Sequence, residues 1–197
     1  MASAFFYGTL MHPRILCRVI GNDGSHLKIC PAVLLEHTRH KVLYADYPGV
    51  IPYSKGRAFF DLDLERDARC VRGTLVTGLT EEDTSYLDTF EGDEYLRRKV
   101  PVHPLEDLRP LADYTIPVGV PVTLLPSESD LGEAVEAETY IYGEPNGLLR
   151  DIWDFDEFVA QNAWKWYGGT APAPELVDSG LTEVERRRAV GTTAVVA

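Results

Sequence analysis

The chain has 197 residues, of which 45% are hydrophobic and 25% charged, as expected of a globular protein with one main core. Its 31 acidic residues against 19 basic ones give a formal net charge of −12, which opposes binding to the phosphates of a nucleic acid. The two basic clusters, Arg97–Lys99 and Arg186–Arg188, are short and are interpreted as solvated charge on a strand edge and on a helix face. We therefore expect no nucleic-acid partner.

The cysteines and the N-terminus indicate a cellular compartment. Cys17, Cys30 and Cys70 form no C-x-x-C pair, which argues against a disulfide framework or a cysteine zinc site and favours a reducing environment. The N-terminus MASAFF lacks a basic segment, and its apolar run is too short for a secretory signal. No stretch approaches the roughly 18 apolar residues of a membrane span. We expect a cytoplasmic protein without a membrane partner, and the sequence carries no signal for an oligomeric state.

The first predicted element is an apolar strand within SAFFYGTLM (3–11), which breaks into Tyr-Gly-Thr-Leu before a helix begins. Such a turn can present main-chain N–H groups to an anion, or it can simply reverse the chain. A short helix is predicted over 12–21, because Pro13 suits a first helical turn and Gly21 an end. Residues 27–44 resemble strand material, and 44–53, which contains Pro-Gly and a second proline, is predicted to be a turn-rich loop.

The second half mixes strands and helices. A strand is predicted over 70–79, with Gly73 marking a bulge or a close approach. The remaining predicted elements are a helix at 80–92 capped by Thr80, strands at 95–105 and 137–143, a helix at 153–168 that Gly168 ends, a linker from 170 and a peripheral helix at 181–190.

The domain prediction follows from this order of elements. Strands outnumber helices without regular alternation, which favours an α+β fold with a curved or closed sheet. Residues 1–168 are predicted to form one domain, and 169–197 a linker with a peripheral C-terminal segment. Residues 104–136 hold five of the 13 prolines and are predicted to be an irregular surface insertion that adds nothing regular to the core.

Signatures of common sites are missing from the sequence. It has no phosphate-binding G-x-x-x-x-G-K-[ST] or G-x-G-x-x-G motif and no G-x-S-x-G nucleophile elbow. His37 and His40 lie in strand-like sequence, where positions three apart face opposite ways, so a shared metal ion is not expected. The remaining candidate is Glu91, which ends a predicted helix just before Gly92 although the helix dipole disfavours negative charge there. An acid in that position is either a surface residue or a general acid/base, with Tyr95 able to orient it or simply to pack in the core.

Two segments together resemble the gamma-glutamylcyclotransferase-like family, which includes the plant avirulence-induced proteins and the gamma-glutamylamine cyclotransferases. FFYGTLM (5–11) is similar to the family's Y-G-[ST]-L turn, and LDTFEGDEYLRRKV (87–100) to its F-E-G…Y-x-R segment. Three further segments follow the family's order, namely YPGVIP (47–52), VRGTLVTGL (71–79) and AETYIY (137–142). The resemblance covers roughly residues 5–143, and the joint order of its short motifs makes it specific.

The resemblance implies a small mixed β-barrel flanked by helices, with the site at one end of the barrel. It implies that Glu91 is the catalytic acid/base, and that the substrate-binding residues are Tyr7, Gly8, Thr9, Leu10, Tyr95 and Tyr140. The residues of the Tyr-Gly-Thr-Leu turn would form a cradle of main-chain N–H groups for a carboxylate or a developing oxyanion. Asp93 and Glu94 lie beside Glu91 in the sequence; either they approach it and raise its pKa, or they face solvent.

The implied activity is that of a cofactor-independent gamma-glutamylcyclotransferase of cytoplasmic glutathione metabolism. The α-amine of a small gamma-glutamyl substrate attacks its own side-chain carbonyl and releases 5-oxoproline and a free amine or amino acid. Neither a metal nor an organic cofactor is required. Two alternatives stay open: the same acid/base chemistry on a gamma-glutamylated specialised metabolite, and a non-catalytic binding module on the same barrel. The insertion at 104–136 motivates the first alternative.

Overall fold

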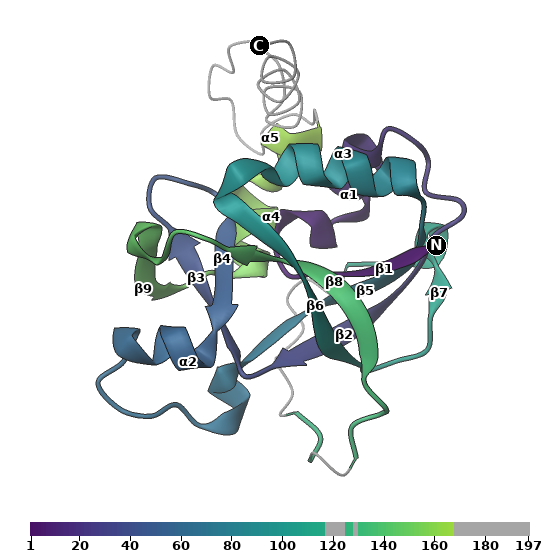
Figure 1. Ribbon diagram of the computed structural model, residues 1–197. Coiled ribbons are helices and arrows are strands. Elements are labelled where there is room, and N and C mark those ends of the chain that lie inside the picture. The colour runs from purple at the N-terminus through teal and green to yellow at the C-terminus, as the bar shows by residue number, and fades with distance from the viewer. Residues whose placement is uncertain (117–124, 128–129, 168–197) are drawn as a thin grey trace.

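The computed structural model describes residues 1–116, 125–127 and 130–167 (Figure 1). The strands are β1 (Ala2–Phe6), β2 (Lys28–Leu35), β3 (His37–Val42), β4 (Pro48–Pro52), β5 (Cys70–Leu79), β6 (Tyr95–Pro104), β7 (Arg109–Pro110), β8 (Val135–Tyr142) and β9 (Leu148–Ile152). The α-helices are α1 (Pro13–Ile20), α2 (Tyr53–Gly56), α3 (Glu81–Glu91), α4 (Phe155–Gln161) and α5 (Ala163–Tyr167), and two of the 3-10 turns are η1 (Thr9–Met11) and η4 (Gly92–Glu94). Among the described residues, no helix is long and apolar enough to cross a bilayer.

Five strands close into a barrel. They are hydrogen-bonded in the order β5-β1-β8-β6-β2, and β2 pairs with β5 to complete the circle, while β7 extends β2 on the outside. The β1–β8 pair is parallel, and the other four pairs of the barrel are antiparallel. This mixed barrel with flanking helices confirms the predicted α+β class. A compact apolar cluster includes residues from all five barrel strands and Val50 of β4. Its buried members are Phe5, Tyr7, Cys30, Ala32, Leu34, Val50, Val71, Leu75, Val100, Val102 and Ala137.

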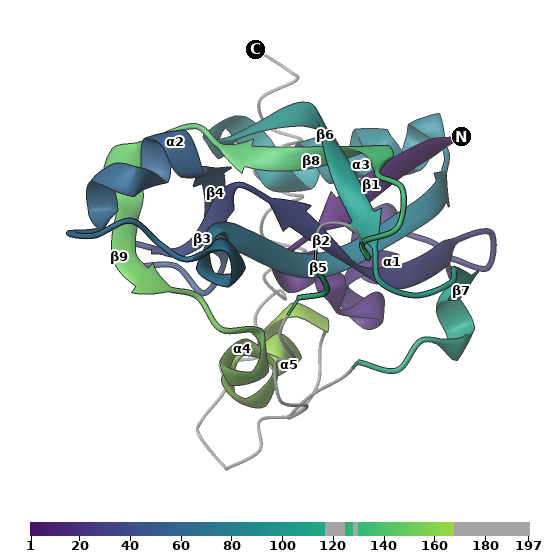
Figure 2. The same ribbon diagram turned by 90° about the horizontal axis from the view of Figure 1, so that it is seen from below.

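A second and larger core lies between the barrel and the helices. Helix α1 packs against α3 and α5, and the indole of Trp166 in α5 is buried among these elements. A separate sheet of order β4-β3-β9 lies with α2 at the end of the molecule opposite the N-terminus (Figures 1 and 2). The barrel is thus covered by helices on one side and extended by a small sheet at one end.

The predicted loop at 44–53 is wrong in its second half, because residues 48–52 form strand β4. Its two prolines occupy the strand's first and last positions, and Val50 and Ile51 between them are buried. The strand pairs with β3 in the register Lys41↔Pro48 to His37↔Pro52. Proline is tolerated at strand ends, where its missing N–H disturbs the ladder least. Turn-forming residues at both ends therefore concealed a short buried strand.

Three other expectations need correction or fall outside the description. The predicted helix at 153–168 is two helices that break at Asn162, and Gly168 is not described. Within the 104–136 insertion, β7 pairs with β2 and Leu111 is buried in the larger core, so the expectation of no core contribution is wrong there. Residues 117–124 and 128–129 of that insertion, and the whole predicted linker and peripheral helix at 169–197, lie outside the described residues.

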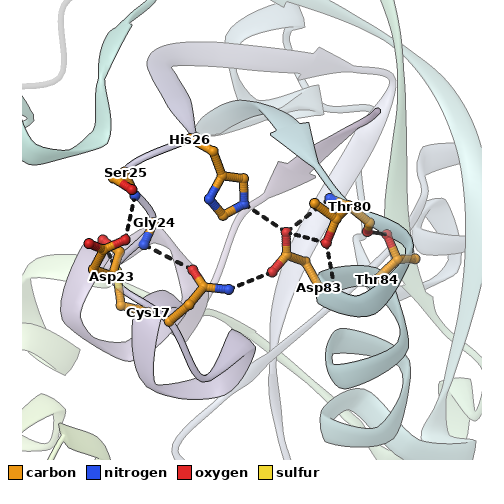
Figure 3. A network of polar contacts seen from close by, with 9 residues as sticks. Cys17, Asp23, Gly24, Ser25, His26, Thr80, Asp83 and Thr84 are labelled. Carbon is orange, nitrogen blue, oxygen red and sulfur yellow. Dashed lines mark hydrogen bonds and ion pairs between the residues drawn. The ribbon is translucent and has the colours of Figure 1, made fainter.

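The N-terminus of α3 is anchored by the buried carboxylate of Asp83 (Figure 3). Thr80 and Asp83 form a capping box, and Oδ2 of Asp83 also accepts a hydrogen bond from Nε2 of His26 at 2.8 Å. Its Oδ1 accepts one from Nδ2 of Asn22 at 2.8 Å. Burial alone would raise the pKa of Asp83, but the hydrogen bonds from Thr80, His26 and Asn22 outweigh it and hold the pKa below its ordinary value. The network ties α3 to the loop between α1 and β2.

We expect Asp83→Asn to lower the free energy of unfolding at neutral pH by about 1.5–3 kcal/mol, the range for hydrogen bonds to a charged group. Because the folded pKa is depressed, the carboxylate stabilises the fold above the unfolded pKa of about 3.9, and this stabilisation is lost as pH falls through the folded value. Urea denaturation from pH 7 to pH 3 should show the difference from wild type shrinking at the acidic end. Glu81→Gln, at an exposed acid of the same helical turn, is the control. Equal stability of wild type and Asp83→Asn at pH 7 would contradict this role.

Candidate functional site

Strand β1 ends at Phe6, and the chain turns through residues 7–10, which we call the cradle. The turn continues into η1, where Met11 donates its N–H to the carbonyl oxygen of Gly8 at 3.0 Å. In the part of the chain that the structure describes, no main-chain acceptor takes the N–H groups of residues 8–10. Because main-chain donors need partners, a turn with open N–H groups can bind an anion.

Gly8 lets the cradle approach strand β4 closely. A Cβ atom at this position would lie 2.8 Å from Cγ and 2.9 Å from Cδ of Pro48. The ring of Pro48 is held in the first position of its strand and has little freedom to move away. A side chain at position 8 would therefore displace the cradle.

The phenol of Tyr7 joins the cradle to β8. Its hydroxyl donates a hydrogen bond to the main-chain oxygen of Tyr140, and its ring is buried in the barrel. Burial and, second, the negative charge of Glu91 raise the pKa of Tyr7 well above its ordinary value, against smaller lowering effects of the Val50 main chain and of Arg39. The Tyr7 hydroxyl thus stays neutral and acts as a donor.

Glu91 is the last residue of α3, and its side chain is half-buried. The next residue, Gly92, has φ 66° and ψ −163°, a conformation that essentially only glycine adopts. The chain can therefore leave the helix directly after Glu91 and enter β6 through η4. The glycine required by this backbone explains the Glu-Gly pair in the sequence.

Two tyrosines line the same cavity as Glu91. The hydroxyl of Tyr95, at the start of β6, donates to the main-chain oxygen of Pro48 at 2.9 Å. Tyr47 donates its hydroxyl to the Glu94 carboxylate at 3.0 Å. Asp93 and Glu94 are exposed, so of the two alternatives for these acids the structure favours the solvent-facing one.

Tyr140 belongs to a chain of polar contacts that reaches the surface. Its hydroxyl donates to Oδ1 of Asp88 at 2.8 Å, and the same oxygen lies 3.2 Å from Nε of Arg97. Burial, the hydrogen bond to Asp88 and the charges of Asp88 and Glu91 raise the pKa of Tyr140. Asp88 stands one helical turn before Glu91 on α3, so it orients the tyrosine ring from the same helix that carries Glu91.

The cradle, Glu91 and the tyrosines at positions 47, 95 and 140 meet in one cavity that opens to solvent. Its lining residues are Phe5, Phe6, Tyr7, Gly8, Thr9, Leu10, Tyr47, Pro48, Phe90, Glu91, Tyr95 and Tyr140. All seven residues predicted from the sequence for a site are among them. Glu91 is the one carboxylate in the described lining, and a carboxylate is a side chain of the kind that serves as a general acid or base.

The sequence model of one protein family, described as gamma-glutamyl cyclotransferase, AIG2-like, matches residues 4–165. The chain belongs to this family. The match spans the cavity-lining residues and nearly all of the barrel and of the helices around it.

Relatives of this AIG2-like chain are found in Arabidopsis thaliana. Protein AIG2 C is 22% identical over 165 residues, covering 83% of this chain and 76% of the relative. AIG2-like protein D is 26% identical over 162 residues, covering 80% of this chain and 79% of the relative. Both alignments extend over most of each chain, so the similarity concerns the whole domain.

Solved structures of the same fold include an Arabidopsis thaliana protein and a yeast enzyme. The first, a solution structure, has a TM-score of 0.50 with 20% identity and covers 91% of this chain and 95% of that one. The second is a crystal structure of a gamma-glutamyl cyclotransferase specific to glutathione. It has a TM-score of 0.50 with 12% identity and covers 98% of this chain and 96% of that one. At such identities the similarity establishes the fold.

Several residues of the site in this AIG2-like chain were not predicted from the sequence. Tyr47 and Pro48 lie in a segment that carried the family resemblance, but only the fold shows that they line the cavity and that Pro48 lies against Gly8. Asp88 precedes Glu91 by one helical turn, and that spacing was the available signal for it. Arg39 lies behind the cradle, and no local sequence signal indicated it.

We expect Gly8→Ala to lower the specific activity about 10²-fold, as displacing a catalytic group by about 1 Å can do. The free energy of unfolding should fall by about 1–3 kcal/mol, because the new methyl group meets the ring of Pro48. Activity assays and urea denaturation measure the two effects. Gly132→Ala is the matched control, since its Cβ atom would have its nearest neighbour at 3.7 Å. A Gly8→Ala protein with wild-type activity would show that the close approach to Pro48 is not required.

Proposed function

We propose that this chain is a gamma-glutamyl cyclotransferase that converts a small gamma-glutamyl compound into 5-oxoproline and a free amine or amino acid. The observation that carries the proposal is the cavity that unites the cradle with Glu91. The cavity opens to solvent, and this open side gives room to the leaving group. Family membership supports the reaction class.

The first step is removal of a proton from the substrate's α-ammonium group, whose ordinary pKa is about 8. Glu91 takes this proton, and the freed amine attacks the gamma-carbonyl carbon of the same molecule. A C–N bond forms, and the carbonyl oxygen becomes an oxyanion that the N–H groups of the cradle stabilise.

In the second step the oxyanion collapses and the C–N bond to the leaving amine breaks. Glu91 gives its proton to that amine. The ring nitrogen loses a second proton as the lactam forms, and the same carboxylate passes it to the amine, which leaves as an ammonium, so the protein ends the cycle unchanged. The cavity also contributes by holding the flexible glutamyl chain with its amine close to its own carbonyl carbon. Only proton transfers and one acyl shift are involved, and the reaction as written needs no metal or organic cofactor.

The location of the protein is a further part of the proposal. Cys17, Cys30 and Cys70 are free thiols, and burial raises the pKa of each. Free thiols are typical of reducing compartments. We propose that the protein acts in the cytoplasm, where glutathione and other gamma-glutamyl compounds are candidate substrates.

We expect Glu91→Gln to lower the rate of 5-oxoproline release by about 10²–10⁴-fold, the usual contribution of a general acid/base. Release is measured by mass spectrometry from a panel of gamma-glutamyl dipeptides, glutathione, gamma-glutamyl amines and gamma-glutamylated specialised metabolites. Asp93→Asn is the control, because Asp93 is an exposed acid two residues away and outside the cavity wall.

The panel separates the proposal from its alternatives. Release by wild type and Asp93→Asn but not by Glu91→Gln supports the proposed reaction and the role of Glu91. Release only from the specialised metabolites would assign the same chemistry to that substrate class. Equal rates for wild type and Glu91→Gln would refute the role of Glu91. No release from any compound, together with binding of one of them, would indicate a non-catalytic binding module.

A further inference from the structure

The guanidinium of Arg39 lies directly behind the cradle. Arg39 belongs to β3, and its Nη1 donates to the main-chain oxygen of Tyr7 at 2.8 Å and to that of Arg72 at 3.3 Å. Its Cζ lies over the ring of Trp153 at 5.2 Å from the centroid. The guanidinium is therefore held between the end of β1, strand β5 and an aromatic face.

Arg39 keeps its positive charge in this place. Burial lowers its pKa to about 10, and the negative charge of Asp154, the N-cap of α4, acts in the opposite direction. The side chain thus remains protonated at neutral pH. A partly buried cation is costly unless it has polar or aromatic partners, and here Nη1 donates to two main-chain oxygens while the guanidinium lies over the face of an indole.

The contact with Tyr7 determines the orientation of the first peptide group of the cradle. The described chain has no cis peptide bond, so the N–H of Gly8 points opposite to the carbonyl of Tyr7. That carbonyl faces Arg39, which is outside the cavity wall, whereas Gly8 is part of the wall.

We propose that Arg39 is a positioning residue for the cradle. By holding the Tyr7 carbonyl on the outer side, it keeps the Gly8 N–H turned toward the cavity. Its charge also polarises the Tyr7–Gly8 peptide and makes that N–H a stronger donor to an anion. An acidic protein thereby attracts an anionic group with a cation that never touches it.

This inference rests on the proposed function, and it is tested by ligand binding as well as by catalysis. The variants are Arg39→Gln, Arg39→Lys, and the control Arg150→Gln, which removes an arginine that is 62% exposed and paired with Asp61. Circular dichroism and Tm establish folding. Binding of 5-oxo-L-proline is followed by calorimetry and by the ¹H–¹⁵N resonance of Gly8.

For Arg39→Gln we expect kcat/KM to fall about tenfold to 10²-fold, somewhat less than on loss of an oxyanion donor itself. The affinity for 5-oxo-L-proline should fall with it, and the ligand-induced shift of the Gly8 amide should shrink. Arg39→Lys should recover part of both, because it restores the charge without the planar guanidinium. A fall in kcat alone would assign the cradle to the oxyanion, and a rise in KM alone to the substrate carboxylate.

The results that would contradict the inference can be told apart from those that would contradict the proposed function. A folded Arg39→Gln protein with wild-type kcat/KM, affinity and Gly8 shift would overturn the inference and leave the proposed function intact. An unfolded Arg39→Gln together with a wild-type-like Arg39→Lys would assign Arg39 to folding alone. A wild-type protein that neither turns over the substrate panel nor binds 5-oxo-L-proline would refute the proposed function, and this inference with it.

Discussion

The parallel seam between β1 and β8 is the contact on which the site depends. Its ladder has a single residue pair, Ala4↔Glu138, and parallel pairing is the weaker kind. Side chains supplement it, because the Thr139 hydroxyl donates to the Phe5 carbonyl at 2.8 Å and the Tyr7 hydroxyl to the Tyr140 carbonyl. These bonds connect the end of β1 to β8, so the cradle and Tyr140 cannot move independently. A seam closed by side chains rather than by a long ladder leaves the main-chain groups beyond it open to a ligand.

The elements that sequence reasoning recovered are those with strong local signals. Helix α3 has Thr80 and Asp83 for a capping box at its start and Gly92 with positive φ at its end, so its limits follow from local chemistry. The predicted close approach at Gly73 is confirmed, since a Cβ there would lie 2.2 Å from the Phe6 carbonyl oxygen. Strand β4 was missed because its prolines read as turn residues, and their tolerance at the strand ends depends on pairing with β3. This segment is a strand because of its tertiary partner β3, which sequence periodicity does not show.

The residues of the site show the same difference between local sequence signals and tertiary contacts. Each cradle residue and Glu91 lies in a short contiguous motif, so family resemblance located them by number and the cavity brings them together. Arg39 could not be found in this way. Its functional contact is with a main-chain oxygen 32 positions earlier, and main-chain acceptors leave no mark in a sequence. The net charge of −12 gives no sign of it either, because total charge says nothing about the place of one partly buried guanidinium.

The position of Glu91 is determined at both ends of its helix. With 11 residues, α3 is about 16 Å long, and its first turn is fixed by the carboxylate of Asp83 far from the cavity. Near its other end the ring of Phe90 packs edge-on against Trp166 at 6.0 Å between centroids. A helix held at its N-terminus by charge-assisted hydrogen bonds and at its C-terminus by aromatic packing has little freedom to slide or rotate. The carboxylate of Glu91 is thus carried by a rigid element, and such a fixed position suits the proton transfers that we propose for it.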